Sequence, residues 1–107
     1  MDELLALSDP PTAVCCYNDM TALGAMRSIY MHGLRVPEEV SLVGFDDLLV
    51  AAYSQPPLTT VRQPMARMGQ LAMENLIKLI SGQETVVRIK VKPELIVRES
   101  TAKVRMR

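Results

Sequence analysis

The sequence has few of the residues on which most catalytic and metal sites depend. Its 107 residues include one histidine, two cysteines and no tryptophan, and no group of Cys and His has the spacing of a zinc site. No glycine-rich loop opens a helix in the manner that binds phosphate, and no serine lies in a nucleophile elbow. His32 stands near an expected helix end, where a histidine more often caps the helix or faces solvent than binds a ligand. We therefore expect no catalytic residue, no metal, no cofactor and no enzymatic activity.

Excess charge and long apolar runs are absent as well. Lys and Arg together number 12, as do Asp and Glu, so the chain lacks the basic excess that duplex DNA binding requires. No apolar stretch approaches the roughly 18 residues that cross a bilayer, and the first residues lack the pattern of a secretory signal. Cys15 and Cys16 are adjacent in an expected strand, where neighbouring side chains point to opposite faces. We expect them to be unpaired, buried thiols in a reducing compartment, the cytoplasm.

The sequence does contain short apolar runs that alternate with helical patterns. Apolar runs that stop at polar pairs are typical of strands buried on both faces of a parallel sheet, whereas apolar residues every three or four positions indicate helices. The expected elements are, in order, a strand at 13–17, a helix at 20–32, a strand at 40–45, a short helix or turn at 48–53, a strand at 58–62, a helix from 65 to about 81, and extended chain over 86–99. This order predicts an α/β fold with an open, mostly parallel sheet flanked by helices.

The helix expected at 20–32 is apolar on two sides. One side is rich in Ala, Leu, Met and Ile and suits packing on the sheet. The other side carries Met20, Gly24 and Met31, with Arg27 between them. A helix that is apolar on two sides usually packs against two partners, and we expect the second partner to be another subunit.

Polar residues follow each expected strand of the sheet. Asn18-Asp19 follow the first strand, Asp46-Asp47 the second, and Gln63 the third. Ligands of open α/β sheets bind at the carboxyl ends of the strands, and amides with carboxylates suit vicinal hydroxyl groups. The alternative is that these residues only cap helices. We expect each pair to divide these roles, with one residue capping and one facing a cleft.

Several segments together resemble the effector domain of the LacI/GalR family of transcriptional regulators. The resemblance covers about residues 11–101, and its combination of motifs is specific although each motif alone is short. The motifs are PTAV at 11–14, NDM at 18–20, ALGA at 22–25, GLRVP at 33–37, VSLVGFDD at 40–47, PPLTTVRQP at 56–64, MG at 68–69 and PELIVREST at 93–101.

The resemblance implies where an effector, a sugar or a similar small molecule, would bind. It places Asn18 and Asp46 at positions that hydrogen-bond the effector, and Gln63 at a crossover beside the cleft between two subdomains. Met65 and Met68 fall where larger apolar or aromatic side chains commonly line the pocket. The resemblance also places the helix from Met20 to Met31 and the loop from Leu48 to Tyr53 in the subunit interface of a homodimer.

The resemblance further implies that parts of the family's architecture lie outside this sequence. We expect residues 1–10 to continue an upstream region, residues 11–101 to form a partial effector-binding and dimerisation domain, and residues 102–107 to be a basic tail. DNA would be bound only through an N-terminal head that precedes the segment present here. The helix at 65–80 would lose its usual cover, so we expect a homodimer in which this helix can be exchanged between chains. Effector affinity is then expected to be weak or absent.

Two other functions remain open from the residues. A periplasmic sugar-binding protein shares the fold, but the motifs at 44–47 and 59–64 together favour the regulator. A phosphoacceptor domain or small α/β enzyme would hold Mg²⁺ on the acidic pair Asp46-Asp47. Such a domain would also need a second acidic pair and a lysine at another strand end, and no such lysine is found.

Overall fold

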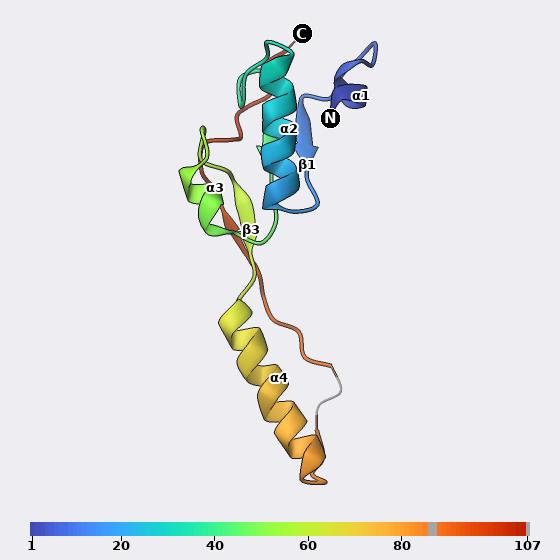
Figure 1. Cartoon of the computed structure of the whole chain (residues 1–107), viewed down its shortest axis with the longest axis vertical. Coiled ribbons are helices and arrows are strands. Elements are labelled where there is room, and N and C mark those ends of the chain that lie inside the picture. The colour runs from blue at the N-terminus through green and yellow to red at the C-terminus, as the bar shows by residue number, and fades with distance from the viewer. Residues whose placement is uncertain (86–87, 107) are drawn as a thin grey trace. The chain divides into compact units, whose positions relative to one another are not determined.

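The computed structural model describes residues 1–85 and 88–106. It divides the chain into two compact units, the first made of Met1–Arg62 with Leu95–Arg107 and the second of Gln63–Glu94 (Figure 1). The predicted boundaries near residues 10 and 101 separate a leader and a tail from the domain, and they do not coincide with the division into two units. They stay a prediction. Each unit is described below by itself.

From residue 13 onward, the order and type of the elements agree with the expectation, whereas the short helix near the N-terminus was not expected. The predicted extended stretch over 86–99 contains one strand near its end, and its first two residues, Val86 and Val87, lie outside the described residues. The elements are α1 (Asp2–Leu5), β1 (Ala13–Cys15), α2 (Asp19–Met31), β2 (Ser41–Val43), α3 (Leu49–Tyr53), β3 (Thr60–Arg62), α4 (Met65–Ile80) and β4 (Glu94–Ile96).

The strands of the first unit run in the predicted parallel sense but pair over short lengths. β1 pairs with β2 in parallel, from Ala13 opposite Ser41 to Cys15 opposite Val43. Two isolated parallel bridges, between Val43 and Thr59 and between Asp46 and Arg62, place β3 alongside β2. β3 in turn pairs with β4. The expected open sheet is therefore present as two short two-stranded sheets joined by bridges.

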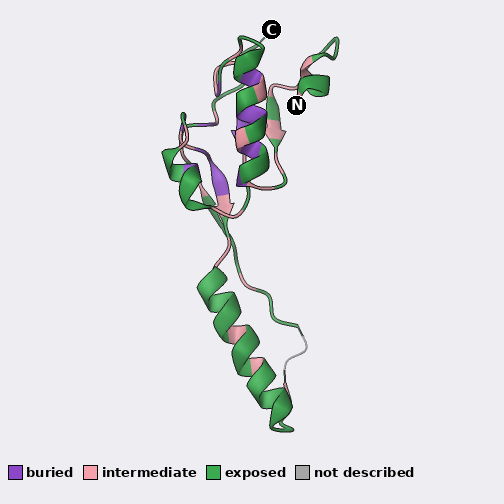
Figure 2. Cartoon of the chain, in the orientation of Figure 1, coloured by how far each residue is buried: buried purple, intermediate pink, exposed green. Residues whose placement is uncertain are grey.

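The core lies between α2 and the strand β2. The side of α2 that was predicted to face the sheet is buried, with Ile29 and Ala22 fully inaccessible (Figure 2). Each fully buried large aliphatic side chain contributes about 1.5–3 kcal/mol relative to exposure. The buried apolar residues are Ala22, Ala25, Met26, Ile29, Val36, Val40, Leu42, Ala51 and Leu58.

The helix α2 begins and ends with side-chain contacts that its sequence predicts. Asn18 precedes the first turn and accepts a hydrogen bond at its end, as described below. His32 is the C-terminal cap residue, and its Nδ1 lies 2.9 Å from the carbonyl oxygen of Ser28. The short helix α1 packs against this end of α2, where the Ser28 hydroxyl donates to the carboxylate of Asp2.

The expectation that the first strand is buried on both faces is wrong. Ala13 and Cys15 are exposed and Val14 is half-buried. α2 packs against β2, whose Ser41 and Leu42 are buried, and a parallel strand is covered on both faces only when helices lie on both. The expectation of buried thiols is therefore wrong for Cys15. Cys16 is half-buried, and this burial raises the pKa of its thiol.

The second unit contains the long amphipathic helix. α4 carries Met65, Met68, Leu76 and Leu79 at helical spacing, and none of its residues is buried. Leu79 and Ile80 are 60% and 78% exposed. The predicted apolar stripe is thus present and uncovered. Across the described residues, no helix combines the length and the apolar character needed to cross a membrane.

Gly44 offers a direct test of the close packing between β2 and its neighbours. A Cβ atom at this buried position would lie 2.9 Å from Leu58 Cδ2 and 3.2 Å from Asp19 Cα, and it would collide with the Asp19 carboxylate. We expect Gly44→Ala to lower the free energy of unfolding by about 1–3 kcal/mol, measured by urea denaturation. Gly24→Ala is the control, because a Cβ atom at that position would have nothing within 4 Å. Equal denaturation midpoints for the two variants would contradict this account.

Candidate functional site at the carboxyl ends of the strands

The carboxyl ends of three strands of the first unit meet at one edge. Asn18 follows β1, the pair Asp46-Asp47 follows β2, and Arg62 ends β3. Two backbone hydrogen bonds hold these ends together. The N–H of Asp19 donates to the carbonyl oxygen of Phe45 over 3.0 Å, and the N–H of Asp46 donates to that of Val61 over 2.9 Å. The predicted gathering of polar residues at one edge is therefore present for the pairs after β1 and β2.

Asn18 acts as the N-cap of α2. Its Oδ1 accepts a hydrogen bond from the N–H of Thr21 over 2.8 Å, which satisfies one of the unpaired amides of the first turn. Within the described residues its side-chain nitrogen makes no hydrogen bond, and the side chain is half-buried. The cap thus uses the amide oxygen and leaves the NH₂ group for contact with a ligand. That contact stays a prediction.

Asp19, the second residue of the first pair, is fully buried. Its Oδ2 accepts from the N–H of Leu48 over 2.7 Å, and its Oδ1 accepts from the hydroxyl of Thr60 over 2.5 Å. A buried carboxylate is stable only when hydrogen-bond donors replace water. Asp19 therefore joins the start of α2 to the residue before α3 and to β3.

The pair Asp46-Asp47 has an unusual backbone conformation. Asp46 has φ 113° and Asp47 has φ 54°, a region that L-residues other than Asn and Asp rarely adopt. The carboxylate of Asp47 is held between two arginines. Arg98 Nη2 donates to its Oδ1 over 2.7 Å, and Arg62 Nε donates to its Oδ2 over 2.7 Å.

The Asp47 side chain is only 8% exposed. Burial is the largest single influence on its pKa and acts to raise it, but the hydrogen bonds and charges of Arg62 and Arg98 together outweigh burial. The pKa of Asp47 is therefore lowered. Both oxygens of the Asp47 carboxylate accept from arginine, so this half of the acidic pair is engaged in ion pairs rather than presented to a Mg²⁺ ion. Among the described residues no group of three or more His, Cys, Asp or Glu is arranged to hold a metal.

The other expected effector contacts lie in the second unit. Gln63 is half-buried just before α4, and Met65 and Met68 lie in its first turn with exposed fractions of 64% and 37%. The structure brings Asn18 and Asp46 to one edge of the first unit. The participation of Gln63, Met65 and Met68 in the same site stays a prediction.

The expected dimer contacts all lie on the surface. Met20, Gly24, Arg27 and Met31 form the side of α2 opposite the core, and none of them is buried. Leu48 precedes α3 and Tyr53 ends it, with exposed fractions of 42% and 80%. Their exposure agrees with a face that could bind a second subunit, whereas the interface itself stays a prediction.

Sequence reasoning missed three residues that organise this edge. Thr60 and Ser100 are fully buried, and Arg98 is 18% exposed. The hydroxyl of Ser100 donates to the carbonyl oxygen of Leu42 over 2.6 Å and accepts from the N–H of Thr59 over 2.8 Å. Arg98 and Ser100 both lie in the closing motif PELIVREST, which was the only signal for them in the sequence.

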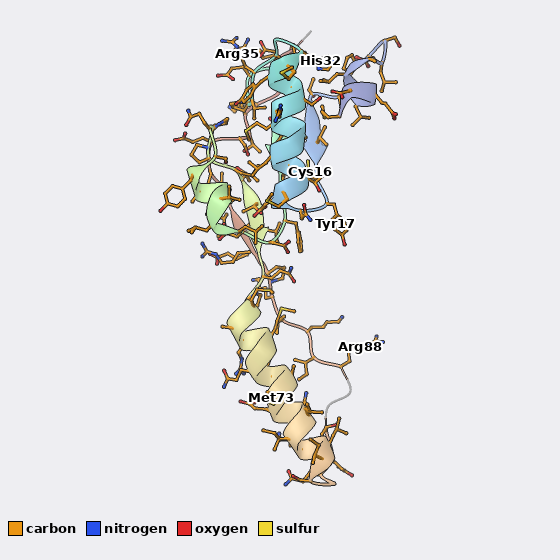
Figure 3. All side chains as sticks on the ribbon, in the orientation of Figure 1. Cys16, Tyr17, His32, Arg35, Met73 and Arg88 are labelled. Atoms are coloured by element: carbon orange, nitrogen blue, oxygen red, sulfur yellow. The ribbon has the colours of Figure 1, made fainter. Side chains whose placement is uncertain are left out.

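Tyr17 is the one labelled aromatic residue at this edge in Figure 3. It extends from the loop between β1 and α2, next to Asn18, and is 88% exposed. Its ring lies at the same end of β1 as the candidate polar contacts.

Comparison with known proteins identifies one family. The family model of the periplasmic binding protein-like domain matches residues 1–101 of this chain. The chain is 42% identical over 104 residues to the HTH-type transcriptional repressor PurR of Vibrio vulnificus (strain CMCP6), covering 96% of this chain and 31% of that protein. It is 46% identical over 101 residues to the probable HTH-type transcriptional repressor ExuR of Bacillus subtilis (strain 168), covering 94% and 30% respectively.

A solved structure of a transcriptional repressor is also similar to this chain. The lac repressor dimer bound to operator and the anti-inducer ONPF matches with a TM-score of 0.87 and 37% identity, covering 94% of this chain and 35% of that one. The chain thus spans about a third of the length of the curated relatives it matches.

The Asp19–Thr60 hydrogen bond can be tested by removing its donor. Thr60→Val keeps the shape of the side chain but leaves the buried Oδ1 of Asp19 without that donor. We expect a loss of about 1–3 kcal/mol in the free energy of unfolding, measured by urea denaturation. Thr60→Ser is the control, since it keeps the hydroxyl and loses one methyl group. The account fails if the serine variant is the less stable of the two.

The Asp47 ion pairs predict a specific dependence of stability on pH. Because the folded-state pKa of Asp47 is lowered, its contribution is complete above the unfolded-state value of about 4 and is lost as pH falls through the lower folded-state value. Urea midpoints measured from neutral pH down to about pH 3 should therefore fall less steeply for Asp47→Asn than for the parent. Asp2 and Glu39 also have lowered pKa values, so the difference between the two curves is the informative quantity. Parallel curves would exclude a contribution from Asp47.

Proposed function

This chain belongs to the periplasmic binding protein-like domain family, and we propose that it serves a LacI/GalR-type transcriptional regulator as a part that senses a small-molecule effector and forms a homodimer. The meeting of Asn18 and Asp46 at the carboxyl ends of two parallel strands carries the proposal. The similarity to transcriptional repressors supports it. A regulator of transcription works where the DNA is, so we place the chain in the cytoplasm.

In this proposal, DNA is bound by a region of the regulator other than the 107 residues of this chain. The chain has no net charge and so lacks the basic excess that neutralises phosphates. Effector binding would shift the conformation of the regulator, and a DNA-binding head would respond to that change.

The proposed effector contacts are Asn18 and Asp46 from the first unit and Gln63, Met65 and Met68 from the second. The amide and carboxylate groups suit a ligand with several hydroxyl groups, such as a sugar, since an amide donates and accepts while a carboxylate accepts. The two methionines would supply adaptable apolar contact. A sugar or a related small molecule is the effector class that this set favours.

Amide NMR spectra of the 107-residue chain test effector binding. We expect a panel of hexoses, hexuronates and purines to include a member that shifts the Asn18 and Asp46 amides saturably, with a Kd in roughly the millimolar range. We expect low affinity because the chain spans about a third of the length of its relatives. Asp46→Ala should abolish the shifts, whereas Glu38→Gln, before β2 at the other end of the strand, should not. Micromolar binding, or shifts that survive Asp46→Ala, would contradict the proposed site.

The proposed dimer face is the exposed side of α2 with the residues around α3. Gly24 lies in the middle of this side, and a Cβ atom placed there would have nothing within 4 Å, so a second helix could approach its backbone closely. The residues of the proposed face are Met20, Gly24, Arg27, Met31, Leu48 and Tyr53.

The apolar stripe of α4 is a second route to association. Its larger members are 37–78% exposed, and contiguous apolar surfaces of several hundred Å² are rare on monomers. We propose that a second copy of the chain covers this stripe, with α4 exchanged between the two chains. The stripe consists of Met65, Met68, Gly69, Ala72, Leu76, Leu79 and Ile80.

Sedimentation velocity separates the two routes. We expect a dimer at high micromolar concentration. Gly24→Arg should produce monomers if α2 forms the interface, and it should leave the fold of the single chain intact because a Cβ atom at this position meets nothing within 4 Å. Leu79→Asp should disrupt the dimer instead if α4 is the main contact. A parent chain that sediments as a monomer throughout would rule out both.

A further inference from the structure

The two arginines around Asp47 form a feature that the proposed function does not use. We call Asp47, Arg62 and Arg98 the Asp47 clamp. The clamp lies entirely within the first unit, and its two ion pairs both measure 2.7 Å. Arg98 makes further contacts, since its Nη1 donates to the carbonyl oxygen of Leu58 over 3.0 Å and its N–H donates to the hydroxyl of Thr59 over 2.9 Å. Arg98 is thereby fixed by the segment that leads into β3.

The clamp acts directly beside the residue proposed to contact the effector. Asp46 precedes Asp47 and has φ 113°, a conformation that an L-residue keeps only when its surroundings enforce it. On one side, the N–H of Asp46 is bonded to the carbonyl oxygen of Val61. On the other side, the clamp holds the Asp47 carboxylate and Asp19 holds the N–H of Leu48. The turn is therefore held on both sides of Asp46.

We propose that Asp47 is a positioning residue for the effector site, which acts through Arg98 and Arg62 to hold Asp46 in its positive-φ backbone conformation. The proposal rests on the proposed function, in which Asp46 contacts the effector. Asp47 itself does not contact the effector, because both of its oxygens are taken up by arginine. The clamp fixes the backbone from which the Asp46 side chain extends.

The two arginines of the clamp lie near the two points at which the chain leaves and re-enters the first unit. Arg62 is the last residue of the first unit before the chain enters Gln63–Glu94, and Arg98 follows three residues after the chain returns at Leu95. The clamp thus ties the turn at Asp46 to both segments that connect the units.

The two arginines should contribute unequally. The Arg98 side chain is 18% exposed, whereas the Arg62 side chain is 50% exposed. Solvent weakens an exposed ion pair more than a buried one, and Arg98 is also anchored by two further hydrogen bonds. We therefore expect removal of the Arg98 guanidinium to disturb Asp46 more than removal of the Arg62 guanidinium.

NMR of the 107-residue chain tests the proposal without any ligand. The three-bond coupling between HN and Hα of Asp46 reports its φ angle. In Asp47→Asn and Arg98→Met, under conditions where each variant is folded, we expect this coupling to rise toward the value of extended backbone. Arg62→Met should change it less, and Arg98→Lys should restore it in part because the charge returns without the second hydrogen-bond donor arm. Urea midpoints measured on the same samples separate folding from positioning.

A clamp that only stabilised the fold would give a different result. The urea midpoints of Asp47→Asn and Arg98→Met would fall, while the Asp46 coupling in the folded fraction would stay at the parent value, and that outcome overturns the proposal. Should Asp47→Asn or Arg98→Met fail to fold, the two single variants Arg62→Met and Arg98→Lys supply the same comparison with milder changes. Failure of the proposed function appears separately, as the absence of shifts at Asn18 and Asp46 in the sugar and purine panel.

Discussion

The buried carboxylate of Asp19 is the interaction on which the arrangement of the first unit depends. Its oxygens accept from the hydroxyl of Thr60 and from the N–H of Leu48, two residues far from it in the sequence. Burying this charge without both donors would be costly, so α2, β3 and the turn before α3 must meet at one place. Gly44 leaves the space that the carboxylate occupies. The edge where Asn18 and Asp46 lie follows from this constraint.

The helices could be predicted from the sequence because their signals are local. The apolar period of α2 and α4 repeats every three or four residues, and the cap made by Asn18 reaches only as far as Thr21. The strands were predicted in the right places but too long, and β1 was wrongly expected to be buried. The length and burial of a strand depend on the segments that pair with it and cover it, and these are set by the tertiary fold rather than by the strand's own residues.

In the candidate site, too, some residues could be placed from the sequence and others could not. Asn18 and Asp46 could be placed at one edge from the rule that parallel strands end together. The roles of Asp19, Asp47 and Arg98 could not, because their partners are 15 to 51 residues away in sequence. No pattern of residue spacing distinguishes an aspartate that will meet a ligand from one that will meet an arginine. Within each pair, the second residue is held by hydrogen bonds to distant segments, whereas the ligand contact of the first residue stays a prediction.

The two exposed apolar surfaces differ in what they can contribute to association. The stripe of α4 offers several large aliphatic side chains, each worth about 1.5–3 kcal/mol when fully buried, so it has the larger hydrophobic driving force. The exposed side of α2 has less apolar area, and it includes Gly24 and a charged residue, Arg27. A glycine and a charge contribute little burial energy, but the glycine permits close approach of a second helix and the charge limits the registers in which that helix can lie. The affinity of a dimer would then come chiefly from α4, whereas the geometry of a symmetric pair would be set by α2.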